Sequence, residues 1–488
     1  MNLGSIEFFV LFLPLGWLAY LLVPRTPRFQ NAVLVVLSTI FYLSWTPSMA
    51  WIMALSISVN FVAALAMERL RTSPGKHRAV FWAAIVYNTG QLVFLKYAGF
   101  FAASLMELMG SDSTATRSSL HFILPIGISF WTLQLIAYQI DVARGRTAAC
   151  RDFLVFSVFV LFFPQIPSGP IPRPHQLLPQ LSKSRHVEPS WISKGAAALL
   201  MGYCLKFLVA DGIASVVVQP AWADPAHHSA LSAWVGLVGY AIQIFGDFAG
   251  YSLMAIGCGR FFGIELPQNF TVPFFSTTMA DFWRRWHITL NSWLFDYLYG
   301  PLLTTRGFFR GRFDLGFVVV FGLSGLWHGA SWPFVIWGFV HGLALAIHRR
   351  WDERLRRLCR TNRVWVTRRK SFAWKCAAWM LTQSFFVVSL VPFRAQNLDE
   401  LRTFAAALLG FSQHGSAIYP SGLEWAMVIA ALGVFATYNI GGTATGIRIW
   451  KTFLRLPAPV RGIGYGLVVV MLLILVPVGT GNFIYAQF

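Results

Sequence analysis

Two histidines lie in a stretch of the chain that is otherwise built from apolar, aromatic and small residues. The stretch is FGLSGLWHGASWPFVIWGFVHG, residues 321–342, and the histidines are His328 and His341. Because histidine titrates near neutral pH, it can both accept and donate a proton. A histidine on a buried helix face can equally be a packing residue, so the residue type alone leaves both interpretations open.

The surroundings favour chemistry at His328 and packing at His341. Ionisable groups in apolar membrane segments are costly and usually face a cavity. His328 lies between Gly325 and Gly329, and small residues let another group approach closely. His341 comes thirteen positions later, more than three helical turns, so the two rings are not expected to pair. His287, upstream, is the second histidine that we expect to move protons in a low-dielectric cavity.

Long apolar runs indicate that these residues belong to a membrane protein. The chain has 488 residues, of which 56% are hydrophobic and only 12% are charged. The first run is followed by further apolar runs rather than by a polar chain, which favours a retained helix over a cleaved signal peptide. The expected spans, each near the length that crosses a bilayer, are 7–24, 29–45, 49–67, 79–97, 120–140, 192–218, 231–258, 313–327, 332–348, 373–393, 424–440 and 462–480.

The basic residues follow the pattern of a multi-pass membrane protein rather than that of a nucleic-acid-binding protein. The formal net charge is +20, and Lys and Arg dominate 69–78 and 349–370, whereas none occurs in 207–259 or 403–447. The two basic loops are therefore expected on the cytoplasmic side. A nucleic-acid reader would need its charge on one continuous face with base-stacking aromatics, so no nucleic-acid partner is expected.

One apolar segment, 153–164, is expected to enter the membrane without crossing it. It is short and runs into QIPSGPIPRP, whose prolines stop a helix. Treating it as re-entrant leaves an even number of crossings between the two basic loops. Irregular backbone survives at membrane depth only within protein or beside a water-filled cavity, so this topology indicates an internal cavity.

The stretch MADFWRRWHITLNSWLFDYLYGPL, residues 279–302, is too polar to span and too apolar to be a solvated loop. We expect an amphipathic helix at the membrane interface, with its tryptophans at headgroup level. Small-residue spacing such as Gly246 to Gly250 indicates only close helix packing. The cysteines are far apart and form no C-x-x-C pair, so neither a disulfide framework nor a metal site is expected; they are Cys150, Cys204, Cys258, Cys359 and Cys376.

Over nearly its whole length the sequence resembles the membrane-bound O-acyltransferases, and within them the bacterial branch that acetylates alginate and transfers D-alanine to teichoic acid. The resemblance rests on the order and spacing of several motifs. These are LPIGISFWTLQLIAYQIDV at 124–142, FFPQIPSGPIPRPHQLLPQL at 162–181, GDFAGYSLMAIGCGRFFGIELPQNFTVPFFS at 246–276, FWRRWHITLNSWLFDYLY at 282–299 and SGLWHGASWPFVIWGFVHG at 324–342.

The resemblance implies an all-α polytopic membrane protein, with about 11–12 transmembrane helices plus re-entrant and interfacial helices around a central tunnel. We expect one integral membrane domain over 1–488, with N-terminal helices in 1–118, the core that carries the motifs in 119–348 and C-terminal helices in 349–488.

The resemblance assigns the catalytic histidine of the Trp-His-Gly motif to His328 and the upstream histidine to His287. A sugar hydroxyl has a pKa far above neutrality, so a positioned base accelerates its attack on an acyl carbonyl by about 10²–10⁴-fold. We expect His328 to take that proton, and His287 to orient the acyl group or handle a second proton. The oxyanion also needs hydrogen-bond donors, and Trp327, Trp332 and Asn291 are the candidates.

Other candidates have two interpretations each. Arg284 and Arg285 either hold phosphates of a coenzyme A donor or anchor the chain to lipid headgroups. Asp247 and Tyr251 either line the tunnel or pair within the helix bundle, and we favour pairing.

Two departures from the family pattern bear on the acceptor and the partner more than on the reaction. Leu253, in AGYSLMA, stands where the family usually has an acidic residue. The loop PLLTTRGFFRGRF lacks the double glycine that often follows the Tyr-x-Pro-Leu element.

The sequence thus predicts an O-acyltransferase of the bacterial cytoplasmic membrane that moves acetyl from acetyl-CoA toward hydroxyls of an exported polysaccharide such as alginate. Acetyl-CoA is its expected substrate, and no bound cofactor is expected. The resemblance also implies a separate periplasmic or extracellular acyl-transfer protein, of the SGNH-like kind.

Two other functions fit the sequence. A transporter or flippase of a lipid-linked sugar or acyl intermediate would also use many spans and broken helices, although the chain shows no two matching halves. A scaffold of an export complex would leave both histidines dispensable.

Overall fold

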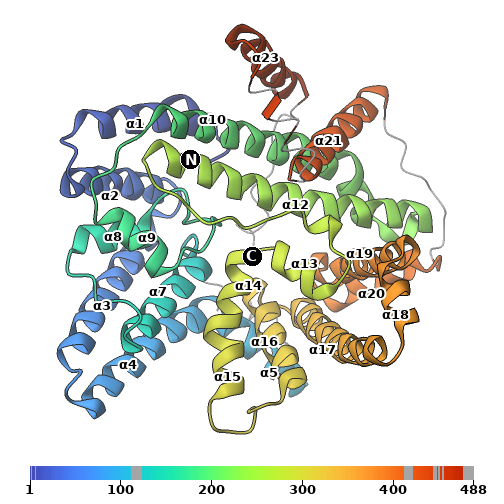
Figure 1. Cartoon of the computed structure of the whole chain (residues 1–488), viewed down its shortest axis with the longest axis horizontal. Helices are drawn as coiled ribbons and strands as arrows, with labels where there is room; N and C mark the ends of the chain where they lie inside the picture. The colour runs from blue at the N-terminus through green and yellow to red at the C-terminus, as the bar shows by residue number, and fades with distance from the viewer. Residues whose placement is uncertain are drawn as a thin grey trace. The chain divides into compact units, whose positions relative to one another are not determined.

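A computed structural model describes the chain except residues 2, 6, 111–123, 412–420, 443–447, 449–450, 453–454 and 476–488. The regular elements of the described residues are helices, which confirms the predicted all-α class (Figure 1). The chain forms two compact units. The first comprises Met1–Leu200 and Tyr251–Gln268, and the second comprises Met201–Gly250 and Asn269–Phe488.

The first unit is built mainly from helices that the hydropathy pattern predicts. Proline stands in the first turn of α2 and α4, where its missing N–H is not needed. The helices are η1 (Phe8–Phe12), α1 (Leu13–Leu22), α2 (Pro27–Leu43), η2 (Pro47–Met49), α3 (Ala50–Arg69), α4 (Pro74–Leu92), η3 (Val93–Tyr97), α5 (Ala98–Leu108), α7 (Ile128–Ala143), α8 (Phe153–Leu161), α9 (Pro174–Leu181) and most of α10 (Pro189–Tyr203).

Buried amides tie three of these helices together. Asn60 on α3 and Asn88 on α4 exchange hydrogen bonds of 3.0 and 2.8 Å, and Gln139 on α7 donates to Asn60 Oδ1 at 2.8 Å. All three side chains are buried. Polar side chains that bond across helices hold membrane helices together where the hydrophobic effect does not.

The segment expected to be re-entrant is broken, as its prolines predict. The short helices α8 and α9 flank residues 162–173, which are buried but not helical. Gln165 Nε2 donates to the Phe159 carbonyl at 2.7 Å. Gly127 (φ +69°) lies so close that a Cβ there would collide with the Ile166 carbonyl. Protein therefore surrounds this irregular backbone, which is the condition for its survival at membrane depth.

The second unit holds the elements that carry the candidate residues. Residues 230–250 of α12 (Ala230–Phe261) belong to it. Its other helices are η4 (Cys204–Asp211), η5 (Ala214–Val218), α11 (Gln219–Ala223), η6 (Pro225–His227), η7 (Pro273–Phe275), α13 (Met279–Arg285), α14 (Ile288–Leu294), η8 (Phe295–Tyr299), α15 (Gly300–Thr304), α16 (Phe313–His328), α17 (Trp332–Thr361), α18 (Arg363–Lys370), α19 (Phe372–Arg394), α20 (Leu398–Leu408), α21 (Gly422–Gly441) and α23 (Ala458–Leu475).

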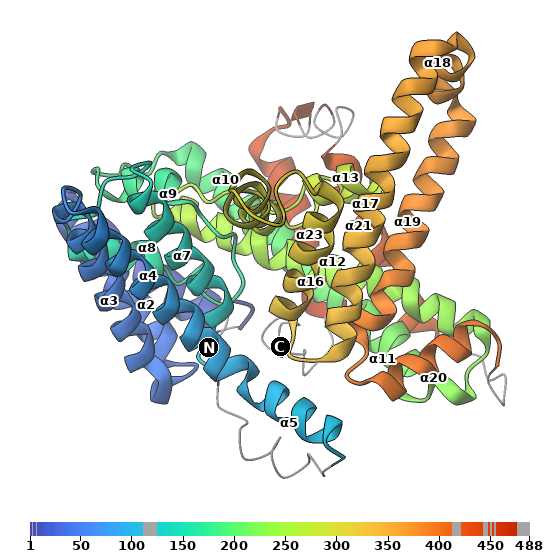
Figure 2. The same cartoon turned by 90° about the horizontal axis from the view of Figure 1, so that it is seen from below.

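Helices α16 and α17 form a tight antiparallel pair because glycines line their contact. A Cβ at Gly342 on α17 would lie 2.6 Å from Val318 Cα and 2.8 Å from the Phe317 carbonyl oxygen. Added Cβ atoms at Gly325 and Gly338 would collide with backbone carbonyls of the opposite helix. Helix α17 continues beyond the predicted span into the basic segment, and Figure 2 shows it beside α19, with α18 joining their ends.

The prediction of one interfacial amphipathic helix over 279–302 is wrong. The stretch is broken into α13, α14, η8 and α15, with a break at Trp286 and His287. Trp283, Trp286 and Trp293 are buried in the protein rather than placed at headgroup level. The mixture of polar and aromatic residues belongs to a broken segment packed inside the protein. Composition alone does not distinguish such a segment from an interfacial helix.

Six helical runs are long and apolar enough to cross a membrane: Pro47–Arg69, Pro74–Leu108, Pro189–Ala223, Ala230–Phe261, Phe372–Arg394 and Gly422–Gly441. Phe8–Leu22 and Phe313–His328 are shorter apolar helices. The predicted span at 29–45 matches α2, and the predicted span at 332–348 is the first part of α17. The spans at 120–140 and 462–480 lie partly outside the described residues. The number of 11–12 crossings remains a prediction.

Candidate active site

His328 is the last residue of α16 and is buried among aromatic rings. Its ring centroid lies 5.0 Å from that of Trp327, 5.0 Å from that of Trp337 and 5.2 Å from that of Phe393. The helix ends here because Gly329 is extended, and the next helix begins at Trp332 with Pro333 in its first turn. A Cβ at Gly329 would collide with the Phe334 ring, so a larger residue at this turn would have to displace that ring.

His287 forms the break between α13 and α14 and has a left-handed backbone, with φ 44° and ψ 52°. For a residue other than glycine this conformation costs about 1–2 kcal/mol. Such strain persists only where the surroundings impose it, and it clusters at functional sites. The imidazole is 1% exposed, so the strained backbone places a titratable ring in the interior.

A neighbouring strand-like segment holds the backbone on both sides of His287. The Ile288 N–H donates to the Asn269 carbonyl at 2.9 Å, and the Thr289 hydroxyl donates to Asn269 Oδ1 at 2.6 Å. The Thr271 N–H donates to the Arg285 carbonyl at 3.0 Å. These bonds fix the break and so fix the direction of the imidazole.

The two histidines meet at one indole. The His287 ring centroid lies 6.2 Å from that of Trp327, the residue directly before His328. Phe248 on α12 packs edge-on against the other side of His287, with centroids 4.5 Å apart. The structure therefore brings His287, Trp327 and His328 together in one aromatic-walled centre.

His341 belongs to the same aromatic cluster but is held by a different partner. Its Nε2 lies 2.9 Å from Ser389 Oγ on α19. The ring of Trp337 lies 4.6 Å from His341 and 5.0 Å from His328, centroid to centroid, so it contacts both imidazoles. This geometry agrees with the packing role that the sequence favours for His341.

Asp247 pairs within the bundle. Its Oδ1 lies 2.6 Å from Lys206 Nζ, and Lys206 also lies 2.9 Å from Asp211 Oδ1. Lys206 and Asp211 are five residues apart, and they share one face because η4 is a π-helix with i→i+5 bonding. Asp247 directly precedes Phe248, so this buried ion cluster fixes α12 next to the residue that contacts His287.

The spacing of Gly246 and Gly250 explains why that cluster can form. A Cβ at Gly246 would lie 2.8 Å from the Leu205 carbonyl oxygen, and one at Gly250 would lie 2.8 Å from the Gly202 carbonyl oxygen. The two glycines let α12 approach the π-helical segment closely enough for a short side chain, Asp247, to reach Lys206.

The remaining candidates lie on α13, α14 and α17. Trp332 begins α17 and is 46% exposed. Asn291 lies in the first turn of α14, where its N–H donates to the His287 carbonyl at 2.9 Å. Arg284 and Arg285 both pair with Asp281, at 3.6 and 3.0 Å.

Tyr251 is buried on the part of α12 that belongs to the first unit. Among the residues that the structure describes, no group of three or more His, Cys, Asp or Glu residues is placed to hold a metal ion.

Several contacts of the centre do not follow from sequence reasoning. Phe248, Trp337 and Phe393 contact the histidines from three different helices. Lys206 and Asp211 form a cluster only in π-helical register. A lysine and an aspartate inside one long apolar run, residues 192–218, are the signal that could have drawn attention to them.

Comparison with known proteins gives consistent results. The family model described as MBOAT, membrane-bound O-acyltransferase family, matches residues 152–391. A probable alginate O-acetylase AlgI of Azotobacter vinelandii is 34% identical over 447 residues, covering 90% of this chain and 85% of that protein.

Two further relatives carry other names. A peptidoglycan O-acetyltransferase of Helicobacter pylori is 32% identical over 440 residues, covering 83% of this chain and 79% of that protein. A teichoic acid D-alanyltransferase of Bacillus subtilis is 28% identical over 253 residues, covering 50% of this chain and 63% of that protein.

Proposed function

Because this chain belongs to the membrane-bound O-acyltransferase family, we propose that it transfers acetyl from cytoplasmic acetyl-CoA toward hydroxyl groups of an exported polysaccharide. The protein is a multi-pass membrane acyltransferase. The proposed location is the cytoplasmic membrane, because the donor is made on one side of it and exported polymers are modified on the other.

The single observation that carries the chemistry is the meeting of His287 and His328 at Trp327. In the proposed reaction an acceptor hydroxyl oxygen attacks the acetyl carbonyl carbon, and His328 takes the hydroxyl proton. The carbon–sulfur bond then breaks, and the thiolate of coenzyme A leaves and is protonated. His287 orients the acyl group or supplies this second proton. A positioned base contributes about 10²–10⁴-fold to such a step.

The oxyanion of the tetrahedral intermediate needs a donor in this aromatic centre. Of the three candidates, the Trp327 indole has the strongest support because its ring contacts both imidazoles. The half-exposed Trp332 has the weakest support. Arg284 and Arg285 remain the proposed contacts for donor phosphates, in competition with their bonds to Asp281.

The names of the relatives support acetyl as the acyl group. The alginate and peptidoglycan relatives named for O-acetylation match over most of this chain, whereas the D-alanyltransferase relative matches over half of it. We therefore assign an exported polysaccharide such as alginate as acceptor. Delivery would pass through a periplasmic or extracellular acyl-transfer protein of the SGNH-like kind.

The test uses the purified full chain in lipid vesicles with acetyl-labelled acetyl-CoA, an alginate oligosaccharide and a candidate SGNH-like partner. The expected result is thiol release matched by acetyl ester on the partner or the oligosaccharide. D-alanine linked covalently to a carrier serves as the competing donor. Acyl transfer from that carrier but not from acetyl-CoA would overturn the assigned donor. Thiol release with peptidoglycan fragments but not with the alginate oligosaccharide would overturn the assigned acceptor.

A further inference from the structure

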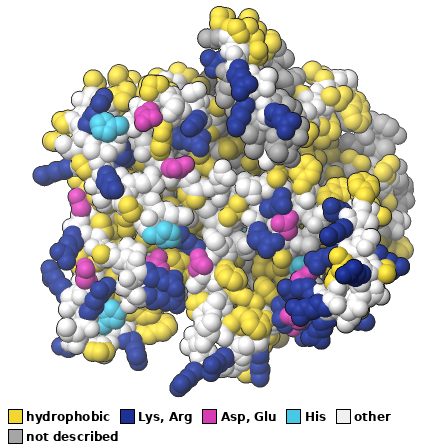
Figure 3. All heavy atoms as spheres, viewed as in Figure 1, with side chains coloured by type: hydrophobic (Ala, Val, Ile, Leu, Met, Phe, Trp, Pro, Cys, Tyr) yellow, Lys and Arg dark blue, Asp and Glu magenta, His cyan; other side chains and the backbone are white. Residues whose placement is uncertain are grey.

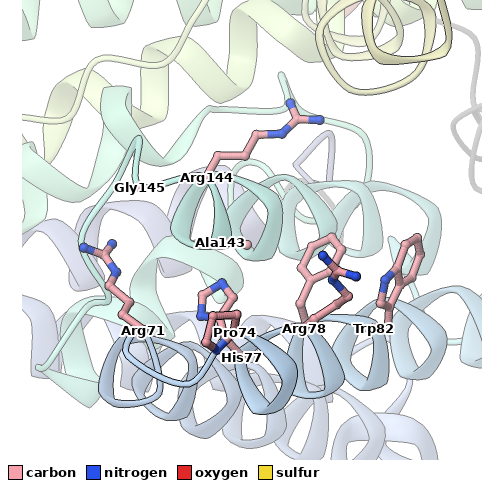
Figure 4. Close-up of a pocket in the computed structure, with 9 residues that line it drawn as sticks. Arg71, Pro74, His77, Arg78, Trp82, Ala143, Arg144 and Gly145 are labelled. Carbon is pink, nitrogen blue, oxygen red and sulfur yellow. The ribbon is translucent and has the colours of Figure 1, made fainter. Parts of the chain in front are cut away.

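A groove in the first unit is lined largely by basic and aromatic side chains and lies away from both histidines in the sequence. Its volume is about 570 Å³, and it lies along the start of α4 and beside the end of α7 (Figure 4). Arg71 enters from the turn after α3, Arg78 and Trp82 lie on α4, and Arg144 and Gly145 follow α7. We call it the basic groove.

The geometry of the groove depends on a glycine and a histidine. Gly145 has φ +70°, and a Cβ there would lie 3.8 Å from Nη2 of Arg71. The guanidinium of Arg71 therefore extends across to Gly145, two residues after the end of α7. His77 is held at the groove by a 2.9 Å hydrogen bond from Nδ1 to the Met67 carbonyl. The groove is thus lined by residues near the end of α3, at the start of α4 and at the end of α7.

Neither of the two acids nearest in the sequence, Glu68 and Asp141, forms an ion pair with an arginine of the basic groove. Glu68 on α3 lies 4.0 Å from Arg151, and Asp141 on α7 lies 3.8 Å from Arg146, and neither of these arginines lines the groove. Within the part of the chain that the structure describes, Arg71, Arg78 and Arg144 form no ion pair with a carboxylate. Guanidinium groups in this setting favour an anion with several oxygens, above all a phosphate.

The apolar surroundings indicate which phosphate compound the basic groove takes. Trp82, one turn after Arg78, is 55% exposed, and Val86, one turn further, is 64% exposed. The helical run from Pro74 to Leu108 is apolar enough to span a membrane, yet only 17% of its most apolar window is buried. We therefore expect lipid chains to cover the face beside the groove, which favours a phosphate ligand that carries acyl chains over a dissolved one.

The surface view agrees with this placement. Figure 3 shows Lys and Arg side chains gathered at its lower left, over the region where Figure 1 places the turn between α3 and α4, with hydrophobic side chains beside them. The basic loop 69–78 is expected on the cytoplasmic side, where anionic lipids attract arginine side chains. Tryptophan side chains such as that of Trp82 are enriched at the membrane–water interface, where lipid headgroups lie.

We propose that the basic groove binds the headgroup phosphate of an anionic phospholipid from the cytoplasmic leaflet. Arg71 and Arg78 approach the headgroup from the two ends of the groove, and Arg144, whose side chain leads away from α4 in Figure 4, adds positive charge at its rim. The Trp82 indole packs against the glycerol and the start of an acyl chain. Each basic residue near an anionic membrane surface contributes about fivefold in affinity. Loss of all three arginines should therefore weaken binding about a hundredfold.

The test measures binding of a fluorescent phosphatidylglycerol to the full chain in neutral detergent, with fluorescent phosphatidylcholine as the zwitterionic comparison. The variant is R71Q/R78Q/R144Q. The matched control, R354Q/R357Q/R360Q, removes the same charge from exposed positions of α17. We expect about hundredfold weaker phosphatidylglycerol binding in the groove variant and less than threefold change in the control.

Two results would overturn the proposal. Equal binding by the groove variant and the control would show that net charge, not the groove, attracts the lipid. Displacement of the lipid by low-millimolar inorganic phosphate would assign the groove to a soluble phosphate compound. Gel filtration and circular dichroism check the folding of each variant. If the triple variant misfolds, the single variant Arg78→Gln should bind about fivefold more weakly, and unchanged binding would contradict the proposal.

Discussion

At the scale of single residues, two histidines far apart in the chain share one indole. His287 reaches it through a strained backbone, and His328 through the end of α16. The sequence is enough to single out His287 and His328 as catalytic candidates and to favour a packing role for His341, because an ionisable ring in an apolar run is conspicuous. It does not predict Trp337 or Phe393 as their neighbours, because the chain is full of aromatics and only packing selects among them.

The backbone and the imidazole of His287 can be tested separately. His287→Gly removes the ring but suits φ 44°, whereas His287→Ala removes the ring and keeps the strain of about 1–2 kcal/mol. We expect both variants to lose acyl transfer about 10²–10⁴-fold, and His287→Gly to unfold at a higher temperature than His287→Ala. Rates and melting temperatures measured in detergent check this. An active His287→Gly would show that the ring serves packing only.

At the scale of elements, the sequence predicts the bounds of several helices closely. It does not predict that residues 279–302 are broken at His287 and packed inside the protein. Apolar runs and prolines define α12, α16 and α19 to within a few residues. The break at His287 depends on bonds to Asn269 and Thr271, which are contacts between separate segments. The ion cluster of Lys206, Asp211 and Asp247 escapes sequence reasoning for a related reason, since helical spacing of 3.6 residues would separate Lys206 from Asp211.

The pairing of α16 with α17 predicts a contrast between two glycines. Gly342→Ala inserts a Cβ within 2.8 Å of two backbone atoms of α16, so it should push the helices apart, cost about 1–3 kcal/mol and lower activity by displacing His328. Gly433→Ala on α21 meets nothing within 4 Å and should raise stability by about 0.5–1 kcal/mol. Thermal unfolding in detergent checks both, and equal melting temperatures would contradict the tight pairing.

At the scale of the whole molecule, the distribution of charge predicts how the chain lies in the membrane. The basic segments 69–78 and 349–370 are expected inside the cell, and 219–230, which has no Lys or Arg, is expected outside. The proposed reaction requires this sidedness, because its proposed donor is cytoplasmic and its proposed acceptor is exported.

Thiol labelling in intact cells checks this orientation. In a cysteine-free background, Ala223→Cys and Thr72→Cys each place a thiol at an exposed position. A membrane-impermeant maleimide should label Ala223→Cys but label Thr72→Cys only after the cells are opened. Labelling of both in intact cells, or the reverse order, would contradict the predicted topology.

Acetyl transfer by His328→Ala, measured with acetyl-CoA, acceptor and partner supplied, shows directly whether His328 is the base. His227→Ala is the control, because His227 is exposed and bonded to Asp224 in the loop before α12. We predict that folded His328→Ala loses at least about a hundredfold in the rate of acetyl transfer, while His227→Ala keeps the wild-type rate. Equal rates for all three proteins would contradict the claim that His328 is the base.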